Sequence, residues 1–180
     1  MPVDDNGLDI TSGIQNYPDA RFALITPAHQ SPLGVALSLA RRHQILEWAD
    51  RSQAWIIEDD YDSESNFTLN PLPALKASDR SGRVVYVSSL SKALSPGLRL
   101  GFMVADPDLI DEARALRRLV YRHPPTNIQY QMAHFLAQGH YETHLRRYHY
   151  DSAQRWERLH AALQRYLPSC RALAGSEHAN

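Results

Sequence analysis

The sequence predicts an α/β fold in which a mixed, mostly parallel sheet is flanked by helices. Three observations carry this prediction. Short apolar runs recur through the first 105 residues and stop abruptly at polar or turn-forming residues, as buried strands do. A helical pattern separates the first two runs at the spacing of a βαβ unit. Apolar residues at helical spacing then dominate the remainder of the chain.

The first half of the chain predicts two parallel strands joined by a helix. Residues 1–21 form an irregular lead-in with turn signals. The run "FALIT" (22–26) is a candidate buried strand that Pro27 stops. A helix follows from about residue 33 to 50, and "AWII" (54–57) is the second strand. This order makes the two strands parallel neighbours.

Two more strands, "VVYV" (84–87) and "LGFMVA" (100–105), follow a proline-rich loop. Only about a dozen residues, rich in Ser, Pro and Gly, separate them, and they contain no clear helix. We therefore expect this pair to be antiparallel. Three helices complete the prediction: 109–120, 128–138 with Gly139 just after its end, and about 141–166.

Composition limits the classes of protein to consider. The chain has 180 residues, 43% hydrophobic and 22% charged, with a formal net charge of −1. This balance gives no general attraction to nucleic acid or anionic membranes. Cys170 is the single cysteine, the first residues lack an apolar signal segment, and no run approaches the ~20 apolar residues of a membrane span. We expect a cytoplasmic protein.

Polar clusters directly follow three of the predicted strands. They are "TPAHQSPLG" (26–34), "EDDYDSE" (58–64) and "SSLSK" (88–92). Function gathers at the carboxyl ends of parallel strands in open α/β sheets. Ordinary loop composition accounts for the Pro and Gly residues. It accounts less well for one Lys and one Arg at fixed offsets from apolar strands.

Lys92 is a candidate nucleophile. An apolar setting favours the neutral form of a lysine amine, which can form a Schiff base with a carbonyl. Asp59 could keep a pyridine nitrogen protonated, and Tyr61 could hydrogen-bond a ring hydroxyl. The hydroxyls of Ser89 and Ser91, with the Arg99 guanidinium, could hold a phosphate. These are the parts that pyridoxal 5′-phosphate (PLP) requires.

The motif "SSLSKALSPGLRLG" resembles the lysine motif of the class I/II aminotransferases, which have fold type I. Together with "TPAHQSPLG" and "IIEDDYDSE", it looks more narrowly like the aminotransferase-like domain of MocR-type GntR transcription regulators. The resemblance extends from "VDDNGL" to about Pro168. It implies part of the fold type I large, PLP-binding domain.

The resemblance also implies roles for individual residues. Lys92 is the Schiff-base lysine, Asp59 pairs with the pyridinium nitrogen, and Tyr61 contacts the ring oxygen. Ser89, Ser91 and Arg99 lie around the phosphate. The resemblance further implies that the ligands are PLP and an amino acid or amine and that the partner is a second copy in a homodimer. From the charge balance, we expect that this segment does not itself bind nucleic acid.

One loop departs from the family pattern. Many aminotransferases have Asn-Pro-x-Gly beside the ring, whereas this chain has Ser31-Pro32-Leu33-Gly34. His29 and Gln30 are therefore the candidates for the contact that the Asn would make. The spacing from Lys92 to Arg99 is one residue shorter than in many aminotransferases and fits the MocR-type pattern.

Three functions remain open at this point. The chain is expected to comprise the central part of the large domain with its long C-terminal helix (1–168) and a truncated start of the small domain (169–180). It would then belong to a PLP- or amine-sensing regulator or to an aminotransferase. The alternative is a truncated, non-catalytic remnant or interaction module that lacks a complete PLP site.

Two other patterns have simpler explanations. His140 and His144 have the i, i+4 spacing of metal ligands, but no acidic or Cys partner is near in sequence. We therefore expect ordinary helix residues rather than a metal site. The arginine pairs 41–42, 117–118 and 146–147 suggest phosphate binding. Because acidic residues surround them, we expect solvated helix faces instead.

Overall fold

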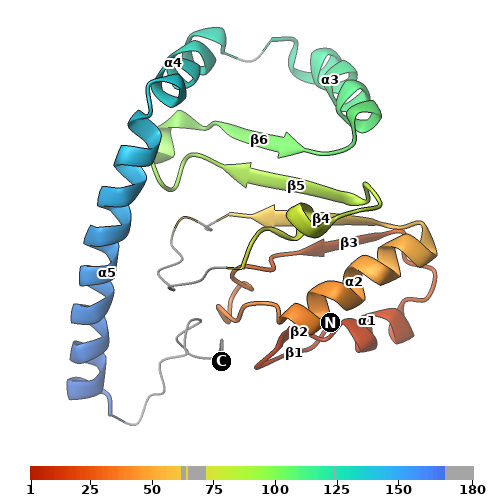
Figure 1. Cartoon of the computed structure of the whole chain (residues 1–180), viewed down its shortest axis with the longest axis horizontal. Helices are drawn as coiled ribbons and strands as arrows, with labels where there is room; N and C mark the ends of the chain where they lie inside the picture. Colours follow the sequence, from red (N-terminus) through yellow and green to blue (C-terminus); the bar gives the residue numbers. More distant parts are fainter. Residues whose placement is uncertain (62–63, 65–71, 124, 169–180) are drawn as a thin grey trace.

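A four-stranded mixed sheet is the centre of the fold (Figure 1). The computed structural model describes residues 1–61, 64, 72–123 and 125–168. The strands are β3 (Phe22–Ile25), β4 (Trp55–Asp60), β5 (Val84–Ser89) and β6 (Gly101–Val104), in this spatial order. β3, β4 and β5 are parallel, and β6 is antiparallel to β5. The predicted fold class and strand directions are confirmed.

Helix α2 (Leu39–Ser52) covers one face of this sheet. It buries Ile45, Trp48 and Ala49 against Ile56 of β4. The helix begins later than the sequence pattern suggested because the chain at Gly34 has φ +75° and Ser38 is still extended. This backbone conformation prevents α2 from extending toward the N-terminus beyond Ser38.

The lead-in is more ordered than expected. It contains a hairpin of β1 (Val3–Asp4) and β2 (Gly7–Leu8), followed by α1 (Ile10–Asn16). Asp9 caps α1, since its carboxylate accepts a hydrogen bond from the Ser12 N–H at 3.1 Å. An N-cap residue of this kind is a helix-start signal that the sequence did contain.

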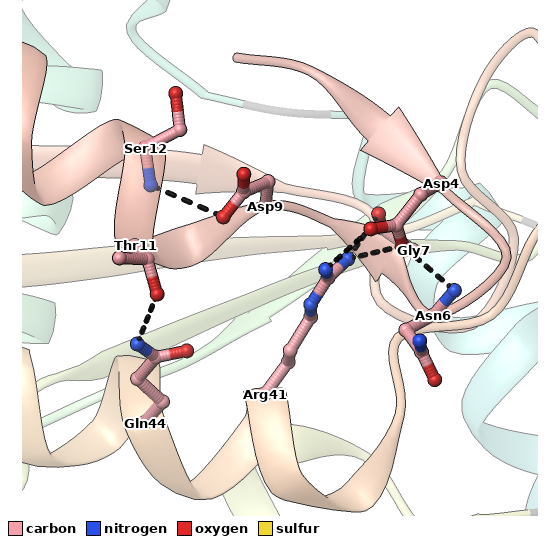
Figure 2. A network of polar contacts seen from close by, with 8 residues as sticks. All are labelled: Asp4, Asn6, Gly7, Asp9, Thr11, Ser12, Arg41 and Gln44. Carbon is pink, nitrogen blue, oxygen red and sulfur yellow. Dashed lines mark hydrogen bonds and ion pairs between the residues drawn. The ribbon is translucent and has the colours of Figure 1, made fainter.

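Polar contacts join this lead-in to α2 (Figure 2). The Arg41 guanidinium donates to both carboxylate oxygens of Asp4 and to the Gly7 carbonyl, each at 2.6 Å. Gln44 donates to the Thr11 hydroxyl at 2.8 Å. Arg41 is thus engaged with protein groups rather than freely solvated.

Strand β3 is buried on only one face. Phe22 and Leu24 are each 65% exposed, whereas Ile25 belongs to the core. Side chains alternate across a strand, and α2 covers only the face that carries Ile25. Among the described residues, the expectation of a buried strand therefore holds for one face of β3 and is wrong for the other.

Short 3₁₀ helices and three long α-helices complete the fold. They are η2 (Leu75–Ser78), η3 (Pro96–Leu98), α3 (Pro107–Tyr121), α4 (Thr126–Ala137) and α5 (His140–Tyr166). Gly139 follows α4 with φ +69°, as predicted for its position. Helix α5 runs past the end of the sheet toward which β3, β4 and β5 point (Figure 1). In the part of the chain that is described, no helix is long and apolar enough to cross a bilayer.

Candidate cofactor site at the strand ends

The loop after β3 and the end of β4 share a cavity of about 220 Å³. Asp59, Gln30 and Ser31 supply polar groups to its wall, and Leu24 and Val35 supply apolar ones. Asp59 is half-buried. Two of the three polar clusters therefore meet at one site, as the parallel strand order requires.

Tyr61 connects these two clusters with the third. Its hydroxyl donates to the His29 carbonyl at 2.9 Å. The Lys92 ammonium lies 4.3 Å from the centre of the Tyr61 ring, within range of a cation–π contact. Residues from the ends of β3, β4 and β5 thus converge on one aromatic ring.

The turn that carries Lys92 is packed, but the lysine side chain is not. Ser91 and Ala93 are buried, at 8% and 3% exposure, whereas Lys92 is exposed. The Leu94 N–H donates to the Leu90 carbonyl at 3.2 Å, which closes the turn. The apolar setting expected for the amine is absent among the described residues, because the turn buries the neighbours of Lys92 and directs the amine outward.

The predicted phosphate ligands are only partly assembled. The Ser89 hydroxyl accepts a hydrogen bond from the Ser91 N–H at 3.2 Å, so these two residues are adjacent. Arg99 is exposed and adopts a left-handed conformation (φ 48°) at the end of η3. Among the described residues, no hydrogen bond links the Arg99 guanidinium to either serine.

The loop residues His29 and Gln30 differ in how they are held. Gln30 accepts from the Leu33 N–H at 3.2 Å and donates to the Ser31 carbonyl at 2.5 Å, so its side chain is used within the loop. The His29 Nε2 atom is buried without a hydrogen-bond partner in the described structure. His29 therefore has the greater capacity to bond a ligand.

Buried carboxylates on β4 support the site, and sequence reasoning did not assign them a role. The exposure alternates along β4, so Glu58 and Asp60 face the α2 side while Asp59 faces away. Glu58 accepts hydrogen bonds from the N–H groups of Leu75 and Lys76 at 2.6 and 2.8 Å. Burial raises the pKa of Glu58. In the run "WIIEDD" the three apolar residues precede the three acidic ones, so the apolar pattern does not indicate which carboxylates point inward.

Asp60 is tied to the neighbouring strand. Its carboxylate accepts from the Tyr86 hydroxyl at 2.6 Å, and its carbonyl accepts from the Ser88 hydroxyl at 2.8 Å. These bonds fix the end of β4 against β5. The half-buried Asp59 and the following Tyr61 consequently sit on a rigid strand end.

Arg42 corrects the prediction of a solvated arginine pair. It is 5% exposed and donates to the carbonyls of Leu37, Pro73 and Pro27 at 3.0, 2.7 and 3.3 Å. Burial lowers the pKa of Arg42, and the negative charges of Glu58 and Asp60 oppose this effect. Arg42 therefore holds both ends of the loop after β3.

Helix α5 reaches the site through Tyr141, which sequence reasoning missed, and through His144, which it considered only for its metal-ligand spacing. The Tyr141 hydroxyl donates to Glu64 at 3.2 Å, and burial followed by the charge of Glu64 raises the pKa of Tyr141. His144 contacts the carbonyl of Ala93 through Nε2 at 2.6 Å. No group of three metal-ligating side chains occurs in the described residues. Tyr141 and Glu64 are 77 residues apart in the sequence, and His144 and Ala93 are 51 residues apart, so no local sequence pattern could have predicted these two contacts.

The donor set matches the chemistry of PLP. A half-buried carboxylate, a lysine amine, an aromatic hydroxyl, an imidazole nitrogen without a partner in the described structure, and two adjacent serines lie at the strand ends. A ring nitrogen, an aldehyde, a ring oxygen and a phosphate find complementary groups among them.

The chain belongs to the aminotransferase class I and II family, whose profile matches residues 4–175. It is 36% identical over 167 residues to the probable rhizopine catabolism regulatory protein MocR of Rhizobium meliloti, covering 93% of this chain and 34% of the relative. It is 42% identical over 144 residues to the HTH-type transcriptional regulator TauR of Rhodobacter capsulatus, covering 79% and 29%. The chain thus spans about a third of the length of these relatives.

Solved structures give the same fold. Kynurenine aminotransferase of Pyrococcus horikoshii matches with a TM-score of 0.86 at 27% identity, over 93% of this chain and 43% of that one. The α-aminoadipate aminotransferase LysN of Thermus thermophilus matches with 0.84 at 27% identity, over 94% and 44%. The chain therefore has a partial fold type I large domain.

Proposed function

We propose that this chain is the PLP-binding part of an aminotransferase-type domain and that Lys92 is the residue to which PLP attaches covalently. The convergence of Lys92, Tyr61 and His29, beside the cavity that Asp59 lines, carries this proposal. The family supports it. The matched Pyrococcus horikoshii structure contains PMP, and that of LysN contains N-(5′-phosphopyridoxyl)-L-leucine.

Each site residue has a proposed task. The Asp59 carboxylate would hold a proton on the pyridine nitrogen, and Tyr61, with His29 or Gln30, would contact the ring oxygen. Ser89, Ser91 and Arg99 would take the phosphate. When bound, PLP supplies an electron sink for chemistry at the α-carbon of an amine. In this proposal the Lys92 amine would take a proton from that carbon.

The two relatives named above favour a regulator over a metabolic enzyme. Both are described as regulatory proteins, at 36% and 42% identity. We therefore propose that PLP or an amine acts here as a sensed ligand, in a cytoplasmic homodimer, and that this segment does not bind nucleic acid. Residues 1–168 would be the large-domain part. The proposed small-domain start, 169–180, lies outside the described residues.

A second candidate function follows from exposed apolar side chains. Leu119 and Tyr121 of α3 are 82% and 75% exposed. A surface of this kind suits an interaction module without a working PLP site. Cofactor attachment distinguishes the two candidates.

The chain offers a well-controlled test, because Lys76 and Lys92 are its only lysines. We would mix the purified chain with PLP, reduce it with borohydride and map the modified peptide by mass spectrometry. One phosphopyridoxyl group on Lys92 is expected. Lys76→Arg should retain this label and Lys92→Arg should lose it. A folded chain labelled equally at both lysines, or at neither, would contradict the proposal.

A further inference from the structure

We propose that His144 of α5 is a positioning residue for Lys92, acting through the backbone of the turn that carries the lysine. This inference rests on the proposed function of Lys92. The contact is direct: His144 Nε2 lies 2.6 Å from the carbonyl oxygen of Ala93, the residue that follows Lys92. The contact joins the first turns of α5 to the turn after β5.

The chemistry of this contact determines which nitrogen of the His144 imidazole carries a proton, and its neighbours orient the ring. A carbonyl oxygen only accepts hydrogen bonds, so Nε2 of His144 carries the proton. The ring of Tyr148 stacks on the imidazole, with centroids 6.5 Å apart and an interplanar angle of 23°. His144 is half-buried, so competition from water for this bond is reduced. The donor therefore has a defined direction toward Ala93.

The turn that carries Lys92 depends on the hydrogen bond from His144 to the Ala93 carbonyl. Its own closing bonds, Leu94 N–H to Leu90 and Ser91 N–H to Ser89, are both 3.2 Å long. Ala93 is 3% exposed with His144 in place, so a side chain of similar bulk without a donor would leave its carbonyl covered and unpaired. The Lys92 side chain is exposed and touches the Tyr61 ring. The position of the amine is consequently set by the backbone that His144 holds.

A second contact on the same face of α5 supports this role. Tyr141 precedes His144 by three residues, which places both on one side of the helix. Its hydroxyl donates to Glu64, which follows β4. Within the described residues α5 has no buried side chain, so polar contacts rather than a core locate its first turns. These two bonds place α5 against two of the three strand ends that form the site, those of β4 and β5.

The test compares two substitutions that differ in one property. His144→Gln keeps an amide N–H that can reach the Ala93 carbonyl, whereas His144→Leu has a similar bulk and no donor. His160→Leu is the matched control, because it makes the same change on the same helix, where the imidazole contacts Gln164. We would measure the rate of borohydride-trapped PLP attachment at Lys92 and the absorbance of the bound cofactor.

We expect His144→Leu to slow attachment roughly tenfold, since a small displacement of a reacting group has effects of this size or larger. His144→Gln should stay within about twofold of the parent, and so should His160→Leu. Equal rates in all variants would overturn the proposal. Equal loss in His144→Leu and His144→Gln would also overturn it, because it would make the N–H donor irrelevant.

Amide hydrogen exchange of the peptide spanning residues 90–95 separates this inference from the proposed function. Faster exchange in His144→Leu alone is expected. Unchanged exchange overturns the positioning role whatever the labelling shows. If the unmodified chain does not label at Lys92, the proposed function fails and the role toward the cofactor fails with it, even where exchange shows that His144 holds the turn.

Discussion

The two halves of the molecule are stabilised in different ways. Among the described residues, the main cluster of buried hydrophobic side chains lies in the first half, between Ile10 and Val84. It joins α1, α2, η2 and the strands β3, β4 and β5. In contrast, α3 and α5 contain no buried residue and α4 contains only Met132. Hydrophobic burial thus defines the first half, whereas caps and polar contacts define the second.

The second half still has clear helix signals. Asp106 caps α3 by accepting from the Asp108 N–H at 3.0 Å, and Pro107 occupies the first turn. Apolar side chains recur on α3 and α4, yet Leu119 and Tyr130 are 82% and 74% exposed. The comparison shows that amphipathic pattern and capping specify where a helix lies in the chain without specifying what covers its apolar face.

Core truncation should have the largest effect. Ile56→Ala on β4 removes a side chain of 0% exposure and should lower the free energy of unfolding by about 2–5 kcal/mol. Denaturant unfolding followed by circular dichroism measures this change. The neighbouring Ile57→Ala, on the half-buried face, is the control and should cost clearly less. Equal losses would contradict a core located on the α2 side alone.

A buried carboxylate gives the next effect and a pH dependence. The Asp79 side chain is 0% exposed and accepts from Lys76 at 2.9 Å and from the Val84 N–H at 3.0 Å. Burial alone would raise the pKa of Asp79, but the Lys76 and backbone hydrogen bonds outweigh it and the pKa is lowered. Asp79→Asn should reduce stability by about 1–3 kcal/mol at neutral pH.

The sign of the pH effect follows from that lowered pKa. The unfolded state takes up the proton first, so the stability from Asp79 is complete above the unfolded pKa of about 3.9 and is lost as pH falls through the folded pKa. Unfolding curves at several pH values should show the parent and Asp79→Asn converging below about pH 4. A constant gap down to acid pH would argue against an ionised Asp79.

Removal of a cap should have a smaller and local effect. Asp106→Ala should cost α3 about 1 kcal/mol, because one terminal N–H loses its acceptor. Since α3 contributes no residue to the core, amide exchange in 107–121 should rise while the global unfolding midpoint changes little. Asp108→Ala, in the same first turn, serves as a control. A large shift of the global midpoint would show that α3 unfolds together with the core.

A surface substitution in α3 should have the smallest effect. Leu119→Gln should change the free energy of unfolding by no more than about 0.5 kcal/mol, because the side chain is 82% exposed. The same change at the 1% exposed Leu75 should be strongly destabilising. If Leu119→Gln destabilised the chain by a comparable amount, α3 would be covered in solution by something outside the described contacts.

Sequence pattern was sufficient for the main elements and the directions of their strands. The runs at 22–26, 54–57 and 84–87 became strands because short apolar segments bounded by turn signals have few other stable arrangements. The short connection before β6 required an antiparallel neighbour. The lysine motif and the acidic motif that begins in the last residues of β4 were sufficient to predict the family.

Only the tertiary structure decided which polar groups are buried and which contacts hold the site. Arg42, Glu58 and Asp60 looked like surface or loop charges. Hydrogen bonds with backbone groups allow Arg42 and Glu58 to be buried, and the Tyr86 hydroxyl donates to the buried Asp60 carboxylate. The turn after β5 leaves Lys92 exposed, and the bond from His144 to Ala93 depends on how α5 packs against that turn. Periodicity reports local backbone geometry, whereas these contacts join residues that only folding brings together.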